Sequence, residues 1–407
     1  MKTGTELRVA GIFAGIGGLE LGLCQAGHHA KVFCEIDAGA VAVLKARFPG
    51  VPVQSDVTAL ASLPKNIDLL TAGFPCQDLS QAGMTRGIGG RQSGLIDHVF
   101  RLLRGADVPW VLLENVPFML QLARGNAIRH VTRGLESLGY QWAYRVIDTR
   151  AFGLPQRRER VFILASKESS PAAVLFGANA EPAIASESSG VPCGFYWTEG
   201  LRGLGWAVES VPTLKGGSTI GIPSPPAIWM PDGSFVTPDI RDAERLQGFN
   251  ADWTLPATES ARSSHRWKLV GNAVSVPVAR WIGTRLTLGR QRCPRNSQPI
   301  SRLSETGTWP RAAFSFEGKA WAAEVSTWPV SKASKPLQEF LKYPLKPLSL
   351  RALEGFLSRL ERSKLSRPCE FDRDLRRAIR LAHSNGDGSS AHVTARSKKR
   401  KPKQRSA

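Results

Sequence analysis

The sequence predicts an α/β protein built around a parallel sheet, on three observations. Short apolar runs alternate with helical patterns along the first 166 residues. The first run, residues 7–13, ends in the glycine turn "AGIGG" and continues as a helix in which Leu19 and Leu23 recur at helical spacing. The chain of 407 residues is also long enough to bury an ample core. Alternating strand and helix units place helices on both faces of a parallel sheet, so a doubly covered sheet is expected.

The order of the elements follows from the apolar runs. After the first strand and helix, further strands are expected at 30–37, 67–74, 110–115, 144–150 and 160–166, with helices after the second strand and at about 94–105 and 120–138. The pattern breaks in residues 167–240, which are rich in Ser, Pro, Gly and Ala. It returns with a helix that Asp239 would cap, a turn and helix over 268–286, and a helical pattern near 348–363.

The charge and the cysteines of the chain indicate its kind of partner and its cellular compartment. From residue 286 onward the chain holds 26 Lys/Arg against 10 Asp/Glu, which favours a polyanion partner, and residues 396–407 form a basic tail expected to be disordered. The six cysteines are scattered without a C-x-x-C pair, so neither a metal site nor a disulfide framework is predicted. No signal peptide or membrane span is expected, and the predicted location is the cytoplasm.

The glycine turn "FAGIGG" is a candidate cofactor site. Such a turn lets backbone N–H groups approach a ligand, and Glu35 follows Gly15 by 20 residues, where an acid can bind ribose hydroxyls. A dinucleotide fingerprint would need glycine at position 20, which is Glu20, so a pyrophosphate is not favoured. By itself the turn is an ordinary tight turn. With Glu35 and Asp56 near the ends of predicted strands, an adenosine-type cofactor without a diphosphate is expected.

Cys76 and Glu114 are candidate catalytic residues. Cys76 follows one predicted strand, in "GFPCQ", and Glu114 ends the next, in "ENV", at the carboxyl edge where open α/β sheets bind ligands. A buried structural thiol and a surface carboxylate are the ordinary interpretations of each residue alone. Side by side, a thiol nucleophile and a carboxylic acid could attack an electron-poor ring and hydrogen-bond its nitrogen.

The charged segment "PQRRER", residues 155–160, is open to two interpretations. It is either a solvated turn or a base-positioning element. Alternation along an extended backbone would place Arg158 and Arg160 on one face and Arg157 on the other. Two arginines on one face could position a base or a phosphate.

Eight motifs together carry a family resemblance: "FAGIGG", "EID", "SDV", "GFPCQ", "ENV", "QRRER", "RDAERLQGF" and "VGNAVSVPVA", in this order over residues 8–285. The chain resembles the DNA cytosine-C5 methyltransferases of bacteria and their phages. The resemblance implies a Rossmann-like S-adenosylmethionine-dependent methyltransferase fold with a small, loop-rich target-recognition domain. The expected divisions are a discontinuous catalytic domain (1–166 plus 265–286), a target-recognition region and hinge (167–264), a basic, partly helical extension (287–395) and the tail (396–407).

The resemblance also implies the chemistry. In a duplex the cytosine must flip out before a thiol can reach C6. Cys76 would then attack C6, Glu114 would contact N3 and the exocyclic amine, and Arg158 would hold the base with support from Gln156 and Arg160. The glycine-rich residues 83–94 resemble the family's mobile loop that closes over the flipped base.

Two further sets of residues come from the resemblance. The S-adenosylmethionine contacts it implies are Phe13, Gly15, Gly17, Glu35, Ile36, Asp56, Pro75 and Asn272. The DNA contacts it implies are Ser80, Arg86, Arg91, Thr213, Leu214 and Arg245.

The expected function is methylation of C5 of cytosine in a specific duplex DNA sequence, in restriction-modification or as an orphan or phage modification enzyme. The implied partners are double-stranded DNA and a restriction endonuclease linked in function only, with the protein acting as a monomer without metal or membrane. Two alternatives stay open at this point: a transfer RNA cytosine methyltransferase of the same architecture, and a DNA-binding regulator on the same fold.

Overall fold

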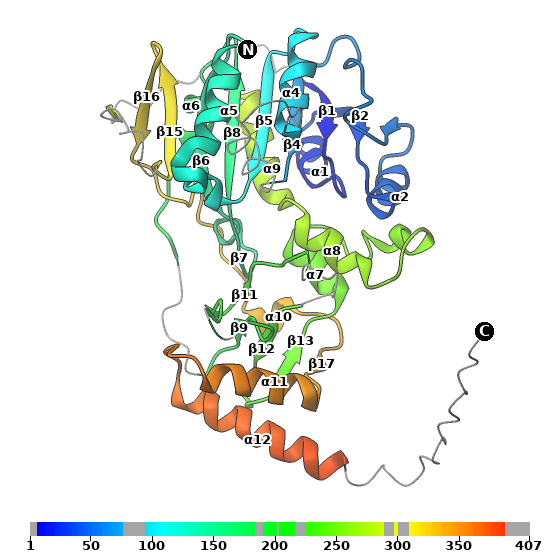
Figure 1. Ribbon diagram of the computed structural model, residues 1–407, viewed down its shortest axis with the longest axis vertical. Coiled ribbons are helices and arrows are strands. Elements are labelled where there is room, and N and C mark those ends of the chain that lie inside the picture. The colour runs from blue at the N-terminus through cyan, green and yellow to red at the C-terminus, as the bar shows by residue number, and fades with distance from the viewer. Residues whose placement is uncertain are drawn as a thin grey trace, which may run out of the picture.

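The computed structural model describes residues 6–75, 94–183, 190–199, 201, 203–216, 225–288, 297–299 and 309–386. Within these ranges the chain forms a large sheet covered by helices and, below it in Figure 1, a small antiparallel sheet that lies against helices α11 (Leu350–Glu361) and α12 (Cys369–Gly386). The two sheets are joined by the segments around β7 (Gln156–Arg157), β11 (Val211–Pro212), α7 (Ile240–Leu246) and α8 (His265–Asn272) (Figure 1).

The large sheet has the strand order β14-β16-β15-β6-β8-β5-β4-β1-β2-β3. Its strands are β1 (Arg8–Ile12), β2 (His29–Cys34), β3 (Val53–Gln54), β4 (Leu69–Gly73), β5 (Trp110–Asn115), β6 (Gln141–Asp148), β8 (Glu159–Ser166), β14 (Ser297–Pro299), β15 (Ala312–Phe316) and β16 (Lys319–Ala323). Strands β3, β2, β1, β4 and β5 are parallel to one another, as expected. The apolar runs of the sequence therefore predicted the strands from β1 to β8 within a few residues, apart from the two-residue strands β3 and β7.

The sheet is mixed and not parallel throughout, which corrects the expectation. Strand β8 runs antiparallel to β5, and β6 runs antiparallel to β8. After β6 the chain passes through the short helix η3 (Thr149–Ala151) and strand β7 (Gln156–Arg157) and returns directly as β8. A parallel return would need a crossover connection of a dozen or more residues, which this connection does not provide.

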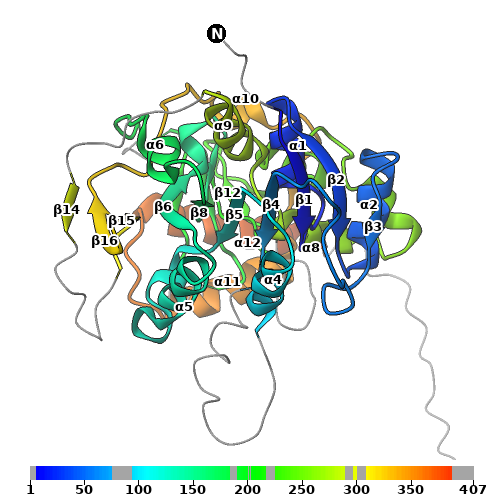
Figure 2. The same ribbon diagram turned by 90° about the horizontal axis from the view of Figure 1, so that it is seen from above.

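Helices cover both faces of the large sheet, as the alternating pattern predicts. In Figure 2, α4 and α5 lie on one face and α1, α6 and α9 on the other. The helices of this layer and its edges are α1 (Gly18–Gln25), α2 (Ala38–Arg47), α4 (Leu95–Arg104), η1 (Pro117–Leu120), η2 (Leu122–Gly125), α5 (Asn126–Glu136), α6 (Pro171–Phe176) and α9 (Val276–Thr287). The buried positions of α4 and α5 contribute to one apolar core and those of α1 and α9 to another, so burial on both faces holds this layer together.

Helix α9 returns the chain to the first βα unit because glycines in α1 allow close contact. A Cβ built on Gly22 would come within 2.5 Å of the Ala279 Cβ and of the Val276 carbonyl oxygen. A Cβ on Gly18 would lie 2.5 Å from the Val274 carbonyl oxygen. Only glycine fits at such approaches, so residues 274–279 lie directly beside the helix that follows the glycine turn.

The small sheet combines the loop-rich region with the C-terminal extension. Its order is β10-β9-β12-β13-β17, and a separate parallel pair joins β11 to β7. These strands are β9 (Cys193–Phe195), β10 (Ala207–Val208), β11 (Val211–Pro212), β12 (Ala227–Trp229), β13 (Phe235–Thr237) and β17 (Lys346–Pro347). The remaining helices are α7 (Ile240–Leu246), η4 (Leu255–Glu259), α8 (His265–Asn272), α10 (Leu337–Phe340), α11 (Leu350–Glu361) and α12 (Cys369–Gly386).

The extension after residue 287 is integrated into both sheets. Strand β15 pairs antiparallel with β6, and β17 pairs with β13. Helices α11 and α12 contribute Phe356 and Phe371 to a core that also contains Phe195 and Phe235 of the small sheet. The helical pattern near 348–363 is confirmed as α11, whereas the strands of this part were not expected because they are short and lack a clear alternation. None of the helices within the described ranges is long and apolar enough to span a bilayer.

Candidate active site

The carboxyl ends of β1, β4 and β5 meet at one edge of the large sheet. Gly73, the last residue of β4, pairs in register with Glu114 on β5. A Cβ built on Gly73 would lie 3.6 Å from Glu114 Oε2 and 3.8 Å from the carbonyl oxygen of Phe13. The glycine turn after β1, the end of β4 and the Glu114 carboxylate are therefore neighbours. Cys76 follows Gly73 by three positions but lies outside the described residues, as do Ser80, Arg86, Arg91 and residues 83–93.

Glu114 and Arg160 form a buried ion pair at this edge. Arg160 Nε lies 3.0 Å from Glu114 Oε1, and the side chains are 14% and 9% exposed. Burial raises the pKa of Glu114 above its ordinary value, while Arg160 and Arg158 oppose that rise. Burial also lowers the pKa of Arg160. The site therefore holds a carboxyl group that retains its proton more readily than a solvated glutamate would.

Arg158 has a different environment from the one that the resemblance implied. Its guanidinium donates from Nη1 to the carbonyls of Leu214 and Gly271, at 3.1 and 3.2 Å, and from Nη2 to the carbonyl of Ala273 at 2.6 Å. The side chain is 1% exposed, and its Nε has no partner among the described residues. Burial lowers its pKa well below the usual range. Arg158 thus ties the "QRRER" segment to two other segments, and Arg160 is the arginine that holds Glu114.

A buried polar network links three of the motifs. Gln156 donates to the Leu246 carbonyl at 2.8 Å and to Gln247 Oε1 at 3.2 Å. Gln247 Oε1 also accepts from Ser275 Oγ at 3.0 Å, and Ser275 Oγ lies 2.9 Å from Thr149 Oγ1. Gln247 is part of "RDAERLQGF", but nothing in that motif distinguished it from its neighbours, and the prediction did not include it.

The Thr213-Leu214 pair lies against the same segment. Thr213 Oγ1 donates to the Arg157 carbonyl at 2.8 Å, and the Leu214 amide donates to Gln156 Oε1 at 3.0 Å. Leu214 is 2% exposed. These groups are hydrogen-bonded within the protein and fasten the loop-rich region to "QRRER".

Arg245 is likewise engaged within the protein. It is paired with the buried Asp242 and donates to the Phe340 carbonyl at 2.6 Å, with its side chain 19% exposed. The structure therefore gives Arg245 an internal role. A DNA contact would require it to leave a buried carboxylate, which is costly.

The predicted cofactor turn has the geometry of a ligand-binding loop. Phe13 and Gly15 have φ of 54° and 55°, and a Cβ added to Gly15 would meet nothing within 4 Å. Glu35 Oε2 accepts from the Gly15 amide at 2.7 Å, and its Oε1 accepts from the Asp37 amide at 2.8 Å. Gly17 has φ of 78° and is packed against Phe48, where a side chain would collide. The left-handed backbone holds the turn against the Glu35 carboxylate and leaves open space above Gly15, where a ligand could lie.

Three of the other predicted cofactor residues follow the neighbouring strands β2, β3 and β4, and the fourth lies on helix α8. Ile36 is 78% exposed, beside Glu35, and Pro75 is exposed after β4. The Thr58 hydroxyl and amide donate to Asp56 at 2.7 and 2.8 Å and lower the pKa of that carboxyl. Asn272 is exposed at the end of α8 and lies near Gly216. Ile36 is an exposed apolar side chain next to the Glu35 carboxylate, and Asp56 supplies a second carboxylate after the neighbouring strand, so the residues present fit S-adenosylmethionine.

Glu20 is a buried carboxyl group that sequence reasoning used only to exclude a pyrophosphate. It lies in the first turn of α1, is 1% exposed, and accepts from the Thr71 hydroxyl at 2.6 Å. Its Oε2 has no partner among the described residues. Burial raises its pKa to about 7. The sequence does carry a signal for this buried group. Glu20 is a carboxylate within an otherwise apolar helical segment, at a position that faces the sheet.

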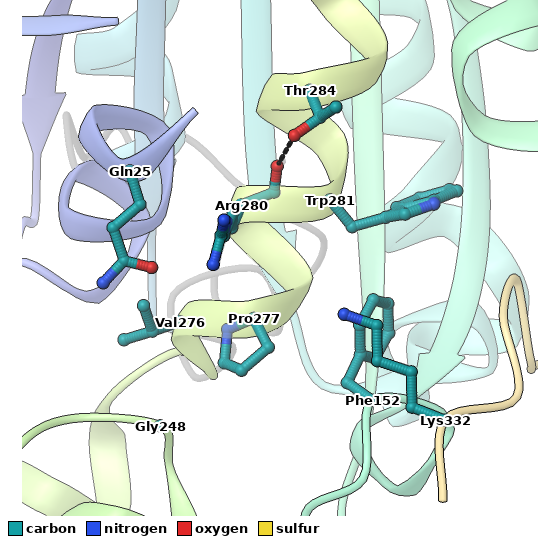
Figure 3. A pocket seen from close by; sticks show the side chains of 9 residues that line it. All are labelled: Gln25, Phe152, Gly248, Val276, Pro277, Arg280, Trp281, Thr284 and Lys332. Carbon is teal, nitrogen blue, oxygen red and sulfur yellow. Dashed lines mark hydrogen bonds between the residues drawn. The ribbon is translucent and has the colours of Figure 1, made fainter. Parts of the chain in front are cut away.

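A surface pocket of about 440 Å³ lies along the first turns of α9, between Gln25, Phe152 and Lys332 (Figure 3). None of the residues predicted for catalysis, cofactor binding or DNA contact lines it. Within the described ranges no group of three or more His, Cys, Asp or Glu side chains is placed to hold a metal ion.

Comparisons with known proteins show which sequences this chain resembles. Residues 7–189 match the family model described as C-5 cytosine-specific DNA methylase. The type II methyltransferase M2.BsuMI of Bacillus subtilis (strain 168) is 49% identical over 375 residues, which cover 88% of this chain and 94% of that protein. The type II methyltransferase M.Bsp6I of Bacillus sp. (strain RFL6) is 28% identical over 311 residues, 68% of this chain and 97% of that protein.

A solved structure shares the fold. The S. pombe Dnmt2 methyltransferase matches with a TM-score of 0.51 at 17% sequence identity, over 69% of this chain and 98% of that one. At this identity the match concerns the fold alone. The extensive identity with a curated relative, over nearly the full length of both chains, decides the family: this chain is a DNA (cytosine-5-)-methyltransferase and belongs to the C-5 cytosine-specific DNA methylases.

Proposed function

We propose that this enzyme methylates C5 of cytosine within a specific duplex DNA sequence, as the modification enzyme of a type II restriction-modification system. The observation that carries the proposal is the buried pair of Glu114 and Arg160 beside Gly73, at the end of the strand that leads to Pro75 and Cys76. Two relatives named type II methyltransferases support the biological setting. The endonuclease of such a system would share the DNA sequence without binding this chain, which acts as a monomer.

The reaction begins with the target base outside the helix, because C6 is stacked between neighbours in a duplex. The Cys76 thiolate forms a bond to C6, and the electron pair of the C5–C6 double bond makes C5 a nucleophile. Negative charge develops toward N3, where Glu114 holds a proton, as its raised pKa favours. Arg160 orients Glu114. Arg158 and Gln156 hold the "QRRER" segment in place through their hydrogen bonds with the backbone of Leu214.

S-adenosylmethionine, when bound, supplies the electrophilic methyl group. The turn at Phe13, Gly15 and Gly17 would receive its methionine part, together with Pro75 and Asn272. Glu35 would accept from the ribose hydroxyls, Ile36 would pack on adenine, and Asp56 would accept from the adenine amine. After C5 has taken the methyl group, a base removes the C5 proton, the C5–C6 double bond re-forms, and the Cys76 thiolate leaves.

Target recognition is assigned to residues 167–264, with the basic extension 287–395 and the tail 396–407 adding contacts to phosphates. Ser80, Arg86 and Arg91 remain predicted DNA contacts. Thr213 and Leu214 are proposed to keep the recognition region in place, since their polar groups are bonded to "QRRER".

Bisulfite sequencing tests the proposal. DNA from a methylation-free host expressing the wild type is compared with DNA from hosts expressing Cys76→Ala and, as a matched control, Cys369→Ala, which removes an exposed cysteine. Protected cytosines that share one sequence context are expected with the wild type and the control, and none with Cys76→Ala. Equal protection with Cys76→Ala would contradict the assignment of the nucleophile.

The same purified protein distinguishes the two alternative functions. If soluble wild type leaves DNA unprotected but transfers label from S-adenosylmethionine to transfer RNA, the DNA assignment fails. If it binds duplex DNA and transfers no methyl group to either acceptor, the regulator becomes the better interpretation.

A further inference from the structure

The turn that follows β5 presents three side chains to solvent on the edge that carries Glu114. Phe118 is 58% exposed, and Gln121 and Arg124 are also exposed. None of these side chains has a hydrogen bond or an ion pair within the described part of the chain. A single exposed phenylalanine is common at protein surfaces. This one lies four residues after the catalytic carboxylate, beside an amide and a guanidinium that are also unpartnered there.

The backbone of this turn is strained at Ala123 and Arg124, two residues that are exposed. Ala123 and Arg124 have φ of 50° and 57°, and Gly125 has φ of 81°. The left-handed conformation is disfavoured for residues with a Cβ, and here two such residues adopt it in succession. Strain of this kind persists where the surroundings enforce it, and it concentrates at ligand-binding sites.

The turn is anchored where strands β4 and β5 end. Asn115 Nδ2 donates to the Phe74 carbonyl at 2.9 Å, and Asn115 Oδ1 accepts from the Val116 amide at 2.8 Å. Met119 and Leu120 are buried in the core beneath the turn. Phe118 is therefore held on a short, anchored segment that connects to Glu114 on one side and to the residues before Cys76 on the other.

We infer that residues 117–125 form a DNA-contacting turn, in which Phe118 stacks on a base that the flipped cytosine leaves exposed and Arg124 pairs with a backbone phosphate. This inference rests on the proposed function. Extrusion of a base uncovers the faces of its neighbours, and an aromatic ring stacks on any base without regard to sequence. Apolar side chains placed between base steps are a known way to stabilise distorted DNA. A guanidinium suits a phosphate.

The test of Phe118 uses Phe118→Ala and Phe118→Trp, with Phe316→Ala as the matched control at a 48% exposed phenylalanine on β15. The probe is a duplex that carries the sequence context found by bisulfite sequencing, with 2-aminopurine at the target position to report flipping. Phe118→Ala is expected to weaken duplex binding about tenfold and to lower the fluorescence gain, because stacking on an aromatic ring contributes about 1–3 kcal/mol per base. Phe118→Trp should restore both signals.

S-adenosylmethionine binding is measured on the same proteins and should not change. If Phe118→Ala binds and flips the duplex like the wild type, or loses affinity for S-adenosylmethionine to the same degree as for DNA, the stacking role is excluded. Failure of the wild type itself to methylate the duplex would instead overturn the proposed function.

The test of Arg124 is the salt dependence of duplex binding. Arg124→Gln should reduce the slope of log affinity against log salt by about 0.9, the value for one phosphate contact. The control is Arg104→Gln, at an exposed arginine that ends helix α4, and it should leave the slope unchanged. An unchanged slope for Arg124→Gln would exclude the phosphate contact.

Discussion

The two buried arginines of "QRRER" show how neighbouring residues of one type acquire different roles. Arg160 meets a carboxylate, and its charge is paired where the base is expected to bind. Arg158 meets three carbonyl oxygens, and its planar fork joins segments that are far apart in the chain. Both are unfavourable to bury, since burial lowers the pKa of each. The Glu114–Arg160 pair lies in the proposed active site, and the hydrogen bonds of Arg158 hold the "QRRER" segment in place.

Glu114→Gln removes the proposed proton donor while keeping the shape of the side chain and an acceptor for Arg160. Methyl transfer should slow by about 10²- to 10⁴-fold, the usual contribution of a general acid. Single-turnover transfer of labelled methyl groups measures this. Asp107→Asn, at an exposed carboxylate, is the control and should transfer at the wild-type rate. A rate within a few-fold of wild type for Glu114→Gln would show that the carboxyl group is not the acid.

Replacement of each arginine by lysine separates the two roles. Lysine lacks the planar fork, so Arg158→Lys cannot serve three carbonyls, and the free energy of unfolding should fall by about 3 kcal/mol. Arg160→Lys retains a cation beside Glu114 and should slow methylation with a smaller loss of stability. Thermal denaturation and the single-turnover rate are measured on both. If Arg158→Lys keeps its melting temperature and Arg160→Lys loses more, the assignment is wrong.

Helix α1 illustrates a constraint at the scale of one element. Its first turn follows the cofactor loop, its glycines allow α9 to approach, and it carries Glu20 into the interface with β1 and β4. A carboxylate buried there without a cation is unfavourable when ionised. The helix can tolerate it because the group holds a proton up to a pH of about 7.

This predicts a pH-dependent effect of Glu20→Gln. A carboxyl group whose pKa is raised in the folded state binds its proton more tightly there, so stability falls as pH rises from about 4.5 to about 7. Above that range the cost is up to about 3 kcal/mol. Glu20→Gln, which still accepts from Thr71, should melt at a higher temperature than the wild type at alkaline pH and not at acidic pH.

The control for this prediction is Glu259→Gln, an exposed carboxylate, for which no such pH dependence is expected. An equal difference between Glu20→Gln and the wild type at acidic and alkaline pH would mean that Glu20 does not titrate in this range.

At the scale of the whole molecule, the loop-rich region and the extension share one core. The ring of Phe371 on α12 lies 5.2 Å from that of Phe195 on β9 and 5.3 Å from that of Phe235 on β13, measured between centroids. The small sheet has short strands and could not bury its apolar face alone. Helices α11 and α12 therefore complete the part of the molecule to which DNA recognition is assigned.

Phe371→Ala should weaken this shared core by about 3–5 kcal/mol, the usual cost of emptying a buried aromatic position. Duplex binding should weaken while S-adenosylmethionine binding at the large sheet is retained. Leu381→Ala, at a 58% exposed position on the same helix, is the control. Equal loss of S-adenosylmethionine binding and DNA binding would contradict this prediction, because it would mean that the substitution also disturbs the large sheet.

The candidate site was predictable to different degrees. Gly15 and Glu35 were predicted because each follows an apolar strand, and Glu114 because it lies at the end of one, since carboxyl ends of neighbouring parallel strands meet at one edge. The buried hydrogen bonds of Gln247 and the exposure of Phe118 were not predicted, because both depend on tertiary contacts that no local pattern encodes. The parallel direction of β6 and β8 was wrong because an apolar run predicts a strand and carries no information on its direction.

By itself, the sequence determined the longer strands from β1 to β8, the glycine turn, the edge that carries the candidate site and the family of the enzyme, since these depend on local periodicity and on motifs in a set order. The tertiary structure alone decided that the sheet is mixed, that Arg160 pairs with Glu114 while Arg158 binds backbone carbonyls, and that the C-terminal helices complete the small sheet. The physical reason is that burial and pairing are properties of segments brought together from distant parts of the chain. Arg158 and Ala273 are 115 residues apart, and their hydrogen bond exists only in the folded molecule.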